Sequence, residues 1–295
     1  MNTLSFQNYG KLFFAVFAWG VSFIATKIAL REISPMTVVW LRFGIGVLVL
    51  AAATMVRKEY RPVSSGDLGY FAMLGFIGIT FHQWLQTTGL ATAAAISSAW
   101  IITTTPIFIA VLGWLFLREK LTVRQIIGIA VATAGVMLIL SQDNPAALWN
   151  GGIGSSGDLL VFLSAANWAV FSVLSRKGLK GISATFMILC VMAFGWLFTS
   201  FVLISNGSFS EIPALSRDGW YAIAFLGIFC SGFAYIFWYD ALKVLPVSNV
   251  GSFLYFEPVT TIIVAIPMLG EKLSLGTIAG GISIFFGVWL VNRKV

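Results

Sequence analysis

One acidic residue lies deep inside an apolar run and is the most informative polar group of the sequence. Glu257 falls near the middle of its run and is followed directly by Pro258. A carboxylate within a bilayer costs several kcal/mol on insertion scales, so it has to face protein or water. Proline removes a backbone donor and loosens the helix beside it. The pair fits a site for a substrate amine or a proton, and equally a carboxyl group that caps a broken helix.

The only histidine, His82, forms a second polar group in another apolar run. Gln83 is its neighbour and Gln86 lies one helical turn away. Imidazole changes charge near neutral pH, and the two amides could bind a carboxylate or amide of a substrate. Such side chains also form hydrogen bonds between membrane helices. The clustering of three polar groups favours a binding site over a purely structural role.

Two further charged residues lie nearer the ends of apolar runs. Arg42 sits about two turns inside its run, where a long side chain can extend to the membrane interface. We expect this snorkelling role for Arg42, and contact with a substrate carboxylate is the alternative. Asp240 lies at the end of its run, where we expect it to be solvated.

No catalytic or cofactor motif accompanies these residues. An intramembrane enzyme needs a nucleophile with a base, or paired acids, or a metal cluster. The two cysteines form no C-x-x-C or His/Cys pattern, and no phosphate-binding loop is present. We therefore expect no enzyme, no cofactor, no metal and no ATP-driven transport. The less favoured alternatives are an intramembrane enzyme, which product formation by purified protein would reveal, and a channel or receptor, of which conductance would reveal the channel.

Composition places these residues in a membrane protein. Apolar residues make up 59% of the 295 residues, charged residues only 10%, and the mean hydropathy is +0.93. A soluble domain averages about 25% charged residues. The net charge of +7 comes from basic residues scattered between apolar runs, so nucleic acid is not an expected partner. The expected partners are membrane lipid and a small molecule.

Ten apolar runs are long enough to cross a bilayer, which takes roughly 20 residues per helix. The runs are continuous rather than alternating, which predicts helices and excludes a barrel. They cover residues 9–30, 36–56, 67–90, 93–116, 123–140, 157–176, 184–204, 216–240, 247–269 and 275–292.

The two halves of the chain resemble each other. Trp19 aligns with Trp168, and Pro106 aligns with Pro258 after one small gap. Leu117-Arg-Glu-Lys-Leu121 aligns with Leu269-Gly-Glu-Lys-Leu273. The sequence predicts a first repeat at 1–141, a linker at 142–156 and a second repeat at 157–295. Because each repeat holds five helices, the second must enter the membrane inverted, a layout common among secondary transporters.

Most lysines and arginines fall on the side of the membrane that would hold both termini. The opposite side carries only four, which are Lys27, Arg31, Arg217 and Lys272. The positive-inside rule then places both termini in the cytoplasm.

Six short motifs of the duplicated unit carry a resemblance to a known family. They are Trp19-Gly20, Arg42-Phe43, Pro106, Glu257-Pro258, Glu119-Lys120-Leu121 and Glu271-Lys272-Leu273. In their order and spacing the unit resembles the EamA-type branch of the drug/metabolite transporter superfamily. Within that branch the pattern is most similar to bacterial exporters of aromatic and other neutral amino acids.

This resemblance implies an all-α membrane protein with ten transmembrane helices, in two inverted five-helix repeats around a central cavity. Helices 1, 3, 4, 6, 8 and 9 would line the cavity, and helices 5 and 10 would pack as a structural pair. It implies export of small metabolites across the bacterial inner membrane by alternating access. An exporter of other metabolites or of drugs is the alternative.

Aromatic residues on the expected cavity helices can hold an apolar side chain or a cation. Lipid-facing placement is the alternative for each one, and we expect at least two to line the cavity. The candidates are Trp100, Trp168, Trp238, Tyr239 and Tyr255.

Prolines and glycines point to moving and packed parts of the bundle. Pro106 and Pro258 occupy equivalent places, which favours hinges near the site over simple kinks. Gly276 and Gly280 form a G-x-x-x-G pattern, which permits close helix packing or dimerisation. Since the duplication supplies an internal partner, we expect a monomer.

Overall fold

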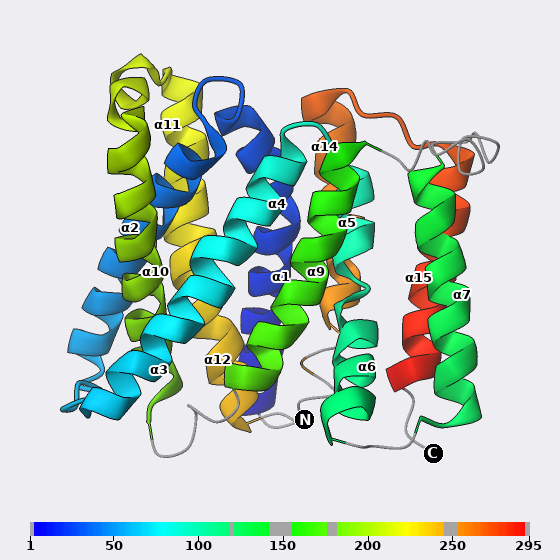
Figure 1. Ribbon diagram of the computed structural model, residues 1–295, viewed down its shortest axis with the longest axis horizontal. Coiled ribbons are helices and arrows are strands. Elements are labelled where there is room, and N and C mark those ends of the chain that lie inside the picture. The colour runs from blue at the N-terminus through cyan, green and yellow to red at the C-terminus, as the bar shows by residue number, and fades with distance from the viewer. Residues whose placement is uncertain are drawn as a thin grey trace.

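A computed structural model gives an all-helical architecture over the residues that it describes, which are 3–117, 121–141, 155–175, 182–244, 250 and 253–292. In this part of the chain, eight helical segments are long and apolar enough to cross a membrane. Two shorter apolar helices, Phe253–Leu269 and Leu275–Val291, accompany them. The chain is therefore an integral membrane protein, and its helices stand side by side in one bundle (Figure 1).

The spans of the first half alternate in direction, beginning with α1 from the side where the N-terminus is marked, and α3–η1–α4 and α5–α6 each form one span (Figure 1). The helices of this half are α1 (Thr3–Ala29), α2 (Pro35–Val56), α3 (Ser65–Gly75), η1 (Phe76–Phe81), α4 (His82–Leu90), α5 (Ala95–Ile102), α6 (Thr105–Leu117) and α7 (Val123–Leu140).

The second half ends with α15, which runs back to the side from which α1 starts (Figure 1). Its helices are α9 (Ser156–Ser175), α10 (Ala184–Asn206), η2 (Ser208–Ala214), α11 (Arg217–Ala224), η3 (Phe225–Phe233), α12 (Ala234–Val244), η4 (Phe253–Phe256), α14 (Glu257–Leu269) and α15 (Leu275–Asn292).

Short polar residues set where several helices begin. Ser64, Ser183 and Ser216 each accept a hydrogen bond from the backbone N–H three residues later. Thr122 and Gln125 form a reciprocal capping box at the start of α7. These caps accept hydrogen bonds from backbone N–H groups of the first turn, which have no acceptor within the helix. The capping residues therefore define where these helices begin.

Four of the spans are composite rather than uniform helices. A π-helical segment, η1, joins α3 to α4, and a second one, η3, joins α11 to α12. Residues Thr103 and Thr104 separate α5 from α6, and the 3₁₀ turn η4 precedes α14. The sequence predicted interruptions only at the prolines. Mid-helix π segments recur at functional sites, so these spans become the place to look for one.

The two hinge candidates lie in the first turn of a helix, directly after an interruption. Pro106 is the second residue of α6 and Pro258 the second residue of α14. Proline fits there because the first-turn N–H has no intrahelical partner. Thr103, Thr104 and Thr105 each donate a hydrogen bond to the carbonyl three residues earlier, which compensates for the broken ladder.

At one edge of the bundle, α7 and α15 pack closely along their lengths (Figure 1). A Cβ added to Gly135 would lie 2.6 Å from the carbonyl oxygen of Gly280, and one added to Gly128 2.6 Å from that of Gly287. Only glycine allows this approach of two backbones. The predicted pairing of the fifth and tenth apolar runs is thus observed.

Large apolar side chains cover the outside of the bundle. Leu48, Phe116, Phe201 and Ile263 are each more than 60% exposed, as expected of surfaces that face lipid tails. Phe43, Phe71, Phe171 and Met187 fill a core between α2, α3, α9 and α10.

Some sequence predictions concern residues outside the described parts. These are Glu119 and Lys120 of the first motif, most of the predicted linker, and the basic residues Arg118, Arg176, Lys177, Lys180, Arg293 and Lys294.

Candidate substrate site

Arg42 is buried at the junction of the two halves, and the expectation that it reaches the interface is wrong. Only 4% of this residue is exposed. Its Nε donates to Oγ of Ser231 over 3.2 Å, and its Nη1 donates to Oε1 of Gln83 over 3.3 Å. Its guanidinium also lies 4.9 Å from the centre of the Phe43 ring. No acidic side chain of the described chain pairs with it.

His82 lies one position before Gln83, at the first residue after the η1 segment. It is 4% exposed, and its Nδ1 lies 3.1 Å from the carbonyl oxygen of Ser164 on α9. Because a carbonyl only accepts, Nδ1 must carry the proton, which leaves Nε2 as an acceptor in the neutral ring. The ring centre lies 4.8 Å from that of Trp168, so two predicted site residues meet.

Gln86 lies one turn beyond His82 on α4 and is half-buried. The neighbouring Gln83 is 5% exposed, and Arg42 occupies its amide oxygen. One member of the polar group predicted from the sequence, Gln83, thus contacts a cation that the sequence did not assign to this group.

Glu257 is the first residue of α14, directly after η4, and is 7% exposed. Its carboxylate makes no hydrogen bond or ion pair with any residue that the structure describes. Its backbone carbonyl accepts from the hydroxyls of Thr260 and Thr261. The positive end of the α14 dipole favours a carboxylate at this position, although no described residue pairs with either of its oxygens.

The Trp19-Gly20 motif of α1 brings the Glu257 region against the rest of the cluster. The hydroxyl of Thr261 donates to the carbonyl of Gly20 over 2.8 Å. A Cβ on Gly20 would lie 1.7 Å from Oγ1 of Thr260, so a larger residue here would push α14 away. Nε1 of Trp19 donates to the carbonyl of Cys230, within η3, over 3.1 Å.

Cys230 is next to Ser231, the residue of η3 to which Arg42 donates. The Cys230 thiol donates to the carbonyl of Ala18 on α1 over 3.2 Å. Two positions further along α1, a Cβ on Gly20 would lie 2.8 Å from the carbonyl oxygen of Glu257. Arg42 and Glu257 therefore both adjoin the part of the bundle where η3 meets α1.

The predicted aromatic residues divide into two sets. Trp238 packs on Trp19 with ring centres 5.2 Å apart, and Tyr239 adjoins the core that holds Phe43. Trp100 instead lies against Gly281 of α15. The Tyr255 ring makes an edge-to-face contact with Phe285 of α15, with ring centres 5.2 Å apart. The structure thus brings Trp168 and Trp238 toward the cluster, whereas Trp100 and Tyr255 border the α7–α15 pair.

A charged cluster closes one end of the bundle above this region. Glu271 accepts hydrogen bonds from the backbone N–H groups of Ala95 (2.7 Å) and Ile96 (3.0 Å), at the start of α5. Lys27 lies 4.0 Å from the same carboxylate and donates to the carbonyl of Ala93. One side chain from the Glu271-Lys272-Leu273 motif thus caps a helix of the other half.

A second cluster ties the helices together at the opposite end. Asp240 of α12 binds Arg57 through two hydrogen bonds of 2.7 and 2.9 Å, and Lys11 of α1 through one of 3.2 Å. The expectation that Asp240 is simply solvated is therefore wrong. Its partners lie far away in sequence, so its position in the apolar run gave no sign of them.

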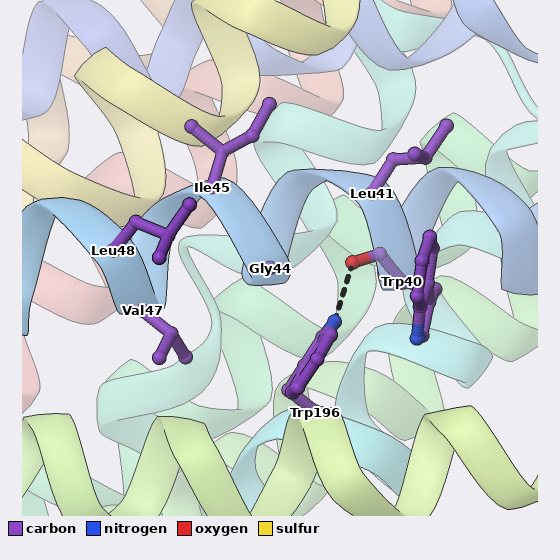
Figure 2. A pocket seen from close by; sticks show the side chains of 7 residues that line it. All are labelled: Trp40, Leu41, Gly44, Ile45, Val47, Leu48 and Trp196. Carbon is purple, nitrogen blue, oxygen red and sulfur yellow. Dashed lines mark hydrogen bonds between the residues drawn. The ribbon is translucent and has the colours of Figure 1, made fainter.

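A groove of about 280 Å³ lies apart from these charges, on the face of α2 that meets α10. It is lined by Trp40, Leu41, Gly44, Ile45, Val47, Leu48 and Trp196. Figure 2 shows Nε1 of Trp196 donating to the carbonyl of Trp40, over 3.1 Å. With a lining almost wholly apolar and Leu48 70% exposed, this groove offers no group for charged chemistry.

Comparisons with known proteins agree on the class of protein. An uncharacterized transporter of Archaeoglobus fulgidus is 29% identical over 277 residues, which is 94% of each chain. The uncharacterized transporter YyaM of Bacillus subtilis is 27% identical and covers 93% of this chain and 90% of its own. A probable terminal-alkyne amino-acid exporter of Streptantibioticus cattleyicolor is 27% identical over 96% of this chain and 92% of its own.

A protein solved by crystallography shares the fold with a TM-score of 0.66, at 19% identity over 97% of this chain and 98% of its own. Residues 9–141 and 155–293 each match the EamA-like transporter family. The chain belongs to the EamA-like transporter family, within the drug/metabolite transporter superfamily.

Proposed function

We propose that this chain is a secondary transporter that exports small metabolites, with amino acids first, across the bacterial inner membrane by alternating access. The observation that carries the proposal is the buried pair Arg42 and Glu257, each without an ionic partner in the described chain. Uncompensated charge at membrane depth is strongly unfavourable. A transporter retains such groups because its substrate supplies the missing partner.

The architecture of the proposal is ten transmembrane helices in two inverted repeats, 1–141 and 157–295, joined by the linker 142–156. Two observations support it. The spacing that aligns Trp19 with Trp168 also aligns Phe76 with Phe225, the first residues of the two π segments. In the second block of the alignment Gly128 matches Gly280 and Gly135 matches Gly287, and the contacts pair Gly128 with Gly287 and Gly135 with Gly280.

This exchange of partners is what an internal two-fold axis between the repeats would give. With an even number of crossings both termini share one side. The excess of Lys and Arg then favours the cytoplasm for that side, and the internal glycine pairing favours a monomer.

The substrate would bind where the halves meet, near the two interrupted spans. Hydrogen bonds from Arg42 to Ser231, from His82 to Ser164 and from Thr261 to Gly20 all cross between the repeats. The proposed binding residues are His82, Gln86, Trp100, Trp168, Trp238, Tyr239, Tyr255 and Glu257, with hinges at Pro106 and Pro258.

Alternating access would use the two charged clusters in turn. Opening to the outside requires separation of Lys27 from Glu271 and of Glu271 from the start of α5. Opening to the inside requires Asp240 to release Arg57 or Lys11. The Thr103–Thr104 break lets α5 move with one cluster while α6 stays in place.

Amino acids rank first as substrates for two reasons. The proposed site offers a buried cation, Arg42, and a buried carboxyl group, Glu257. The similar protein of Streptantibioticus cattleyicolor carries the name of a probable terminal-alkyne amino-acid exporter. Catalysis is not part of the proposal, because the matching family and the names of the similar proteins point to transport.

The test is counterflow in proteoliposomes loaded with a mixture of amino acids, with and without a pH gradient. Saturable exchange of a subset of the amino acids is the expected result. Exchange of drugs or nucleosides in its place would retain a carrier and discard amino acids. Conductance without saturation would identify a channel and reject the proposal.

A further inference from the structure

We propose that Arg42 binds the carboxylate of the substrate while Glu257 binds its ammonium group, so that the site selects zwitterionic amino acids over amines and acids. This inference rests on the proposed transport function and assigns the substrate's two charged ends to named residues. Arg42 enters as a specificity-determining residue that the sequence pattern placed at the membrane interface.

Arg42 has donors to spare. A guanidinium carries five N–H groups, and the described chain engages only Nε and Nη1, both with neutral acceptors. Nη2 has no hydrogen-bond partner among the described residues. The planar Nη1–Nη2 edge is the geometry that binds a carboxylate through two parallel hydrogen bonds. The amide of Gln83 would have to give way, and a flexible side chain can do so.

Glu257 offers the complementary half of the site. The residue is more than nine-tenths buried, and its carboxylate has no partner among the described residues. An ammonium group carries three donors and no acceptor, so it would use oxygen lone pairs that are otherwise unsatisfied. The helix start at α14 fixes the position of this carboxylate, because Thr261 ties the same turn to Gly20.

Arg42 and Glu257 do not pair, because the distance between their nitrogens and oxygens exceeds the 4.0 Å limit of an ion pair. Both adjoin the junction of η3 and α1, since Arg42 donates to Ser231 of η3 and a Cβ on Gly20 of α1 would lie 2.8 Å from the carbonyl oxygen of Glu257. A ligand that carries both charges would compensate both groups. A ligand with one charge would leave either the Arg42 guanidinium or the Glu257 carboxylate without a partner of opposite charge, which is unfavourable.

The surroundings fit the rest of an amino acid. Trp19, Tyr235 and Trp238 form a contiguous aromatic group beside Cys230, with ring centres 5.2 and 5.6 Å from that of Trp19. Aromatic faces accept apolar side chains of different shapes. The charged pair would therefore set the backbone of the substrate, and the aromatic group would tolerate several neutral side chains.

A purely structural role for Arg42 makes a different prediction. Arg42 joins α2 to α4 and η3 through Gln83 and Ser231, so its loss would then lower stability and affect all substrates alike. The inference instead predicts crossed specificity, in which each variant loses the ligand group that its residue binds.

The experiment uses inhibition of amino-acid counterflow by phenylalanine, phenethylamine and 3-phenylpropionate, which carry both charges, the amine alone and the acid alone. For the wild-type protein we expect inhibition by phenylalanine at concentrations at least about tenfold lower than by either analogue, since tenfold reflects only a modest ionic contribution. Equal inhibition by phenylalanine and phenethylamine would overturn the role of Arg42.

The variants separate the two ends. Arg42→Gln should weaken inhibition by phenylalanine at least about tenfold and leave inhibition by phenethylamine unchanged. Glu257→Gln should weaken inhibition by phenylalanine and leave inhibition by 3-phenylpropionate unchanged. Parallel loss of all three ligands in Arg42→Gln would overturn the inference in favour of a structural role. If Arg42→Gln does not fold, Arg42→Lys, which keeps the charge and loses the planar edge, takes its place with the same expected order.

The results for the wild-type protein also distinguish a failure of this inference from a failure of the proposed function. Wild-type protein that exchanges amino acids but does not discriminate the analogues retains the function and overturns the inference. Wild-type protein that exchanges none of the amino acids overturns the amino-acid function and the inference together.

Discussion

Nε of Arg42 donates a hydrogen bond to Oγ of Ser231 over 3.2 Å, which joins α2 of the first half to the η3 segment of the second. The two residues are 189 positions apart in sequence. A π segment widens the helix by one residue per turn and turns its side chains away from the regular pattern. The link therefore places a buried cation at an irregular part of the backbone, where a small movement could change its partners.

Replacement of His82 by Ala should weaken substrate binding about five- to tenfold, the value of one hydrogen bond of roughly 1 kcal/mol. The ring faces Trp168 and keeps Nε2 as a free acceptor. The measurement is the half-saturation concentration in counterflow. Trp84→Leu on the same helix, with 40% of Trp84 exposed, is the control. An unchanged saturation curve would return His82 to a packing role.

Removal of the Glu271 side chain should destabilise the protein by about 1–3 kcal/mol. Glu271→Ala leaves the N–H groups of Ala95 and Ile96 without acceptors and Lys27 without its acidic partner. The unfolding temperature in detergent is the readout. Lys272→Ala, an exposed change at the next position, should have little effect, and equal losses in both variants would argue against the cap.

Acid should weaken the loop contacts made by Glu32 and Glu211. Hydrogen bonds from the hydroxyl and N–H of Ser216 hold the pKa of Glu32 below its ordinary 4.5. Burial alone would raise the pKa of Glu211, but hydrogen bonds from Ser34 and Thr37 outweigh burial and lower it. A carboxyl group with a lowered folded-state pKa stabilises the protein above the unfolded value and loses this contribution as pH falls.

The unfolding temperature should therefore decrease as pH drops below about 4.5, the unfolded value. The decrease should be smaller in the double variant Glu32→Gln, Glu211→Gln, which has no carboxylates to protonate at these positions. Identical pH profiles for the wild-type protein and the double variant would show that these loop contacts contribute nothing.

Enlargement of Gly135 should separate α7 from α15. A Cβ at this position already meets the Gly280 carbonyl at 2.6 Å, so Gly135→Leu should lose at least about 1–3 kcal/mol or fail to fold. The readouts are the yield of monodisperse protein and its unfolding temperature. Gly69→Leu, where no atom lies within 4 Å of an added Cβ, is the matched control. Wild-type stability in Gly135→Leu would contradict the observed packing.

The spans could be predicted from the sequence because lipid forces every apolar run of sufficient length into a helix. Pro106 and Pro258 also marked two interruptions correctly, since proline acts on the backbone next to it. The π segments were not predicted, because neither Phe76–Phe81 nor Phe225–Phe233 contains a proline to mark an interruption.

The polar cluster was predicted only in part for a related reason. His82 and Glu257 stood out because any ionisable group at mid-membrane does. Arg42 and Asp240 were misplaced because their partners, Ser231 and Arg57, lie more than 180 residues away. A signal was present for Arg42, since Ser231 follows Cys230 in a span that was already expected to line the cavity.

The most direct test of the central claim is amino-acid counterflow by Glu257→Gln in proteoliposomes, beside the exposed first-turn control Asp218→Asn. The substitution removes the buried negative charge and keeps the shape of the side chain. We predict at least about a tenfold loss of exchange in Glu257→Gln at an unchanged unfolding temperature, and wild-type exchange in Asp218→Asn. Wild-type exchange in Glu257→Gln would remove the carboxylate from the substrate site and contradict the account.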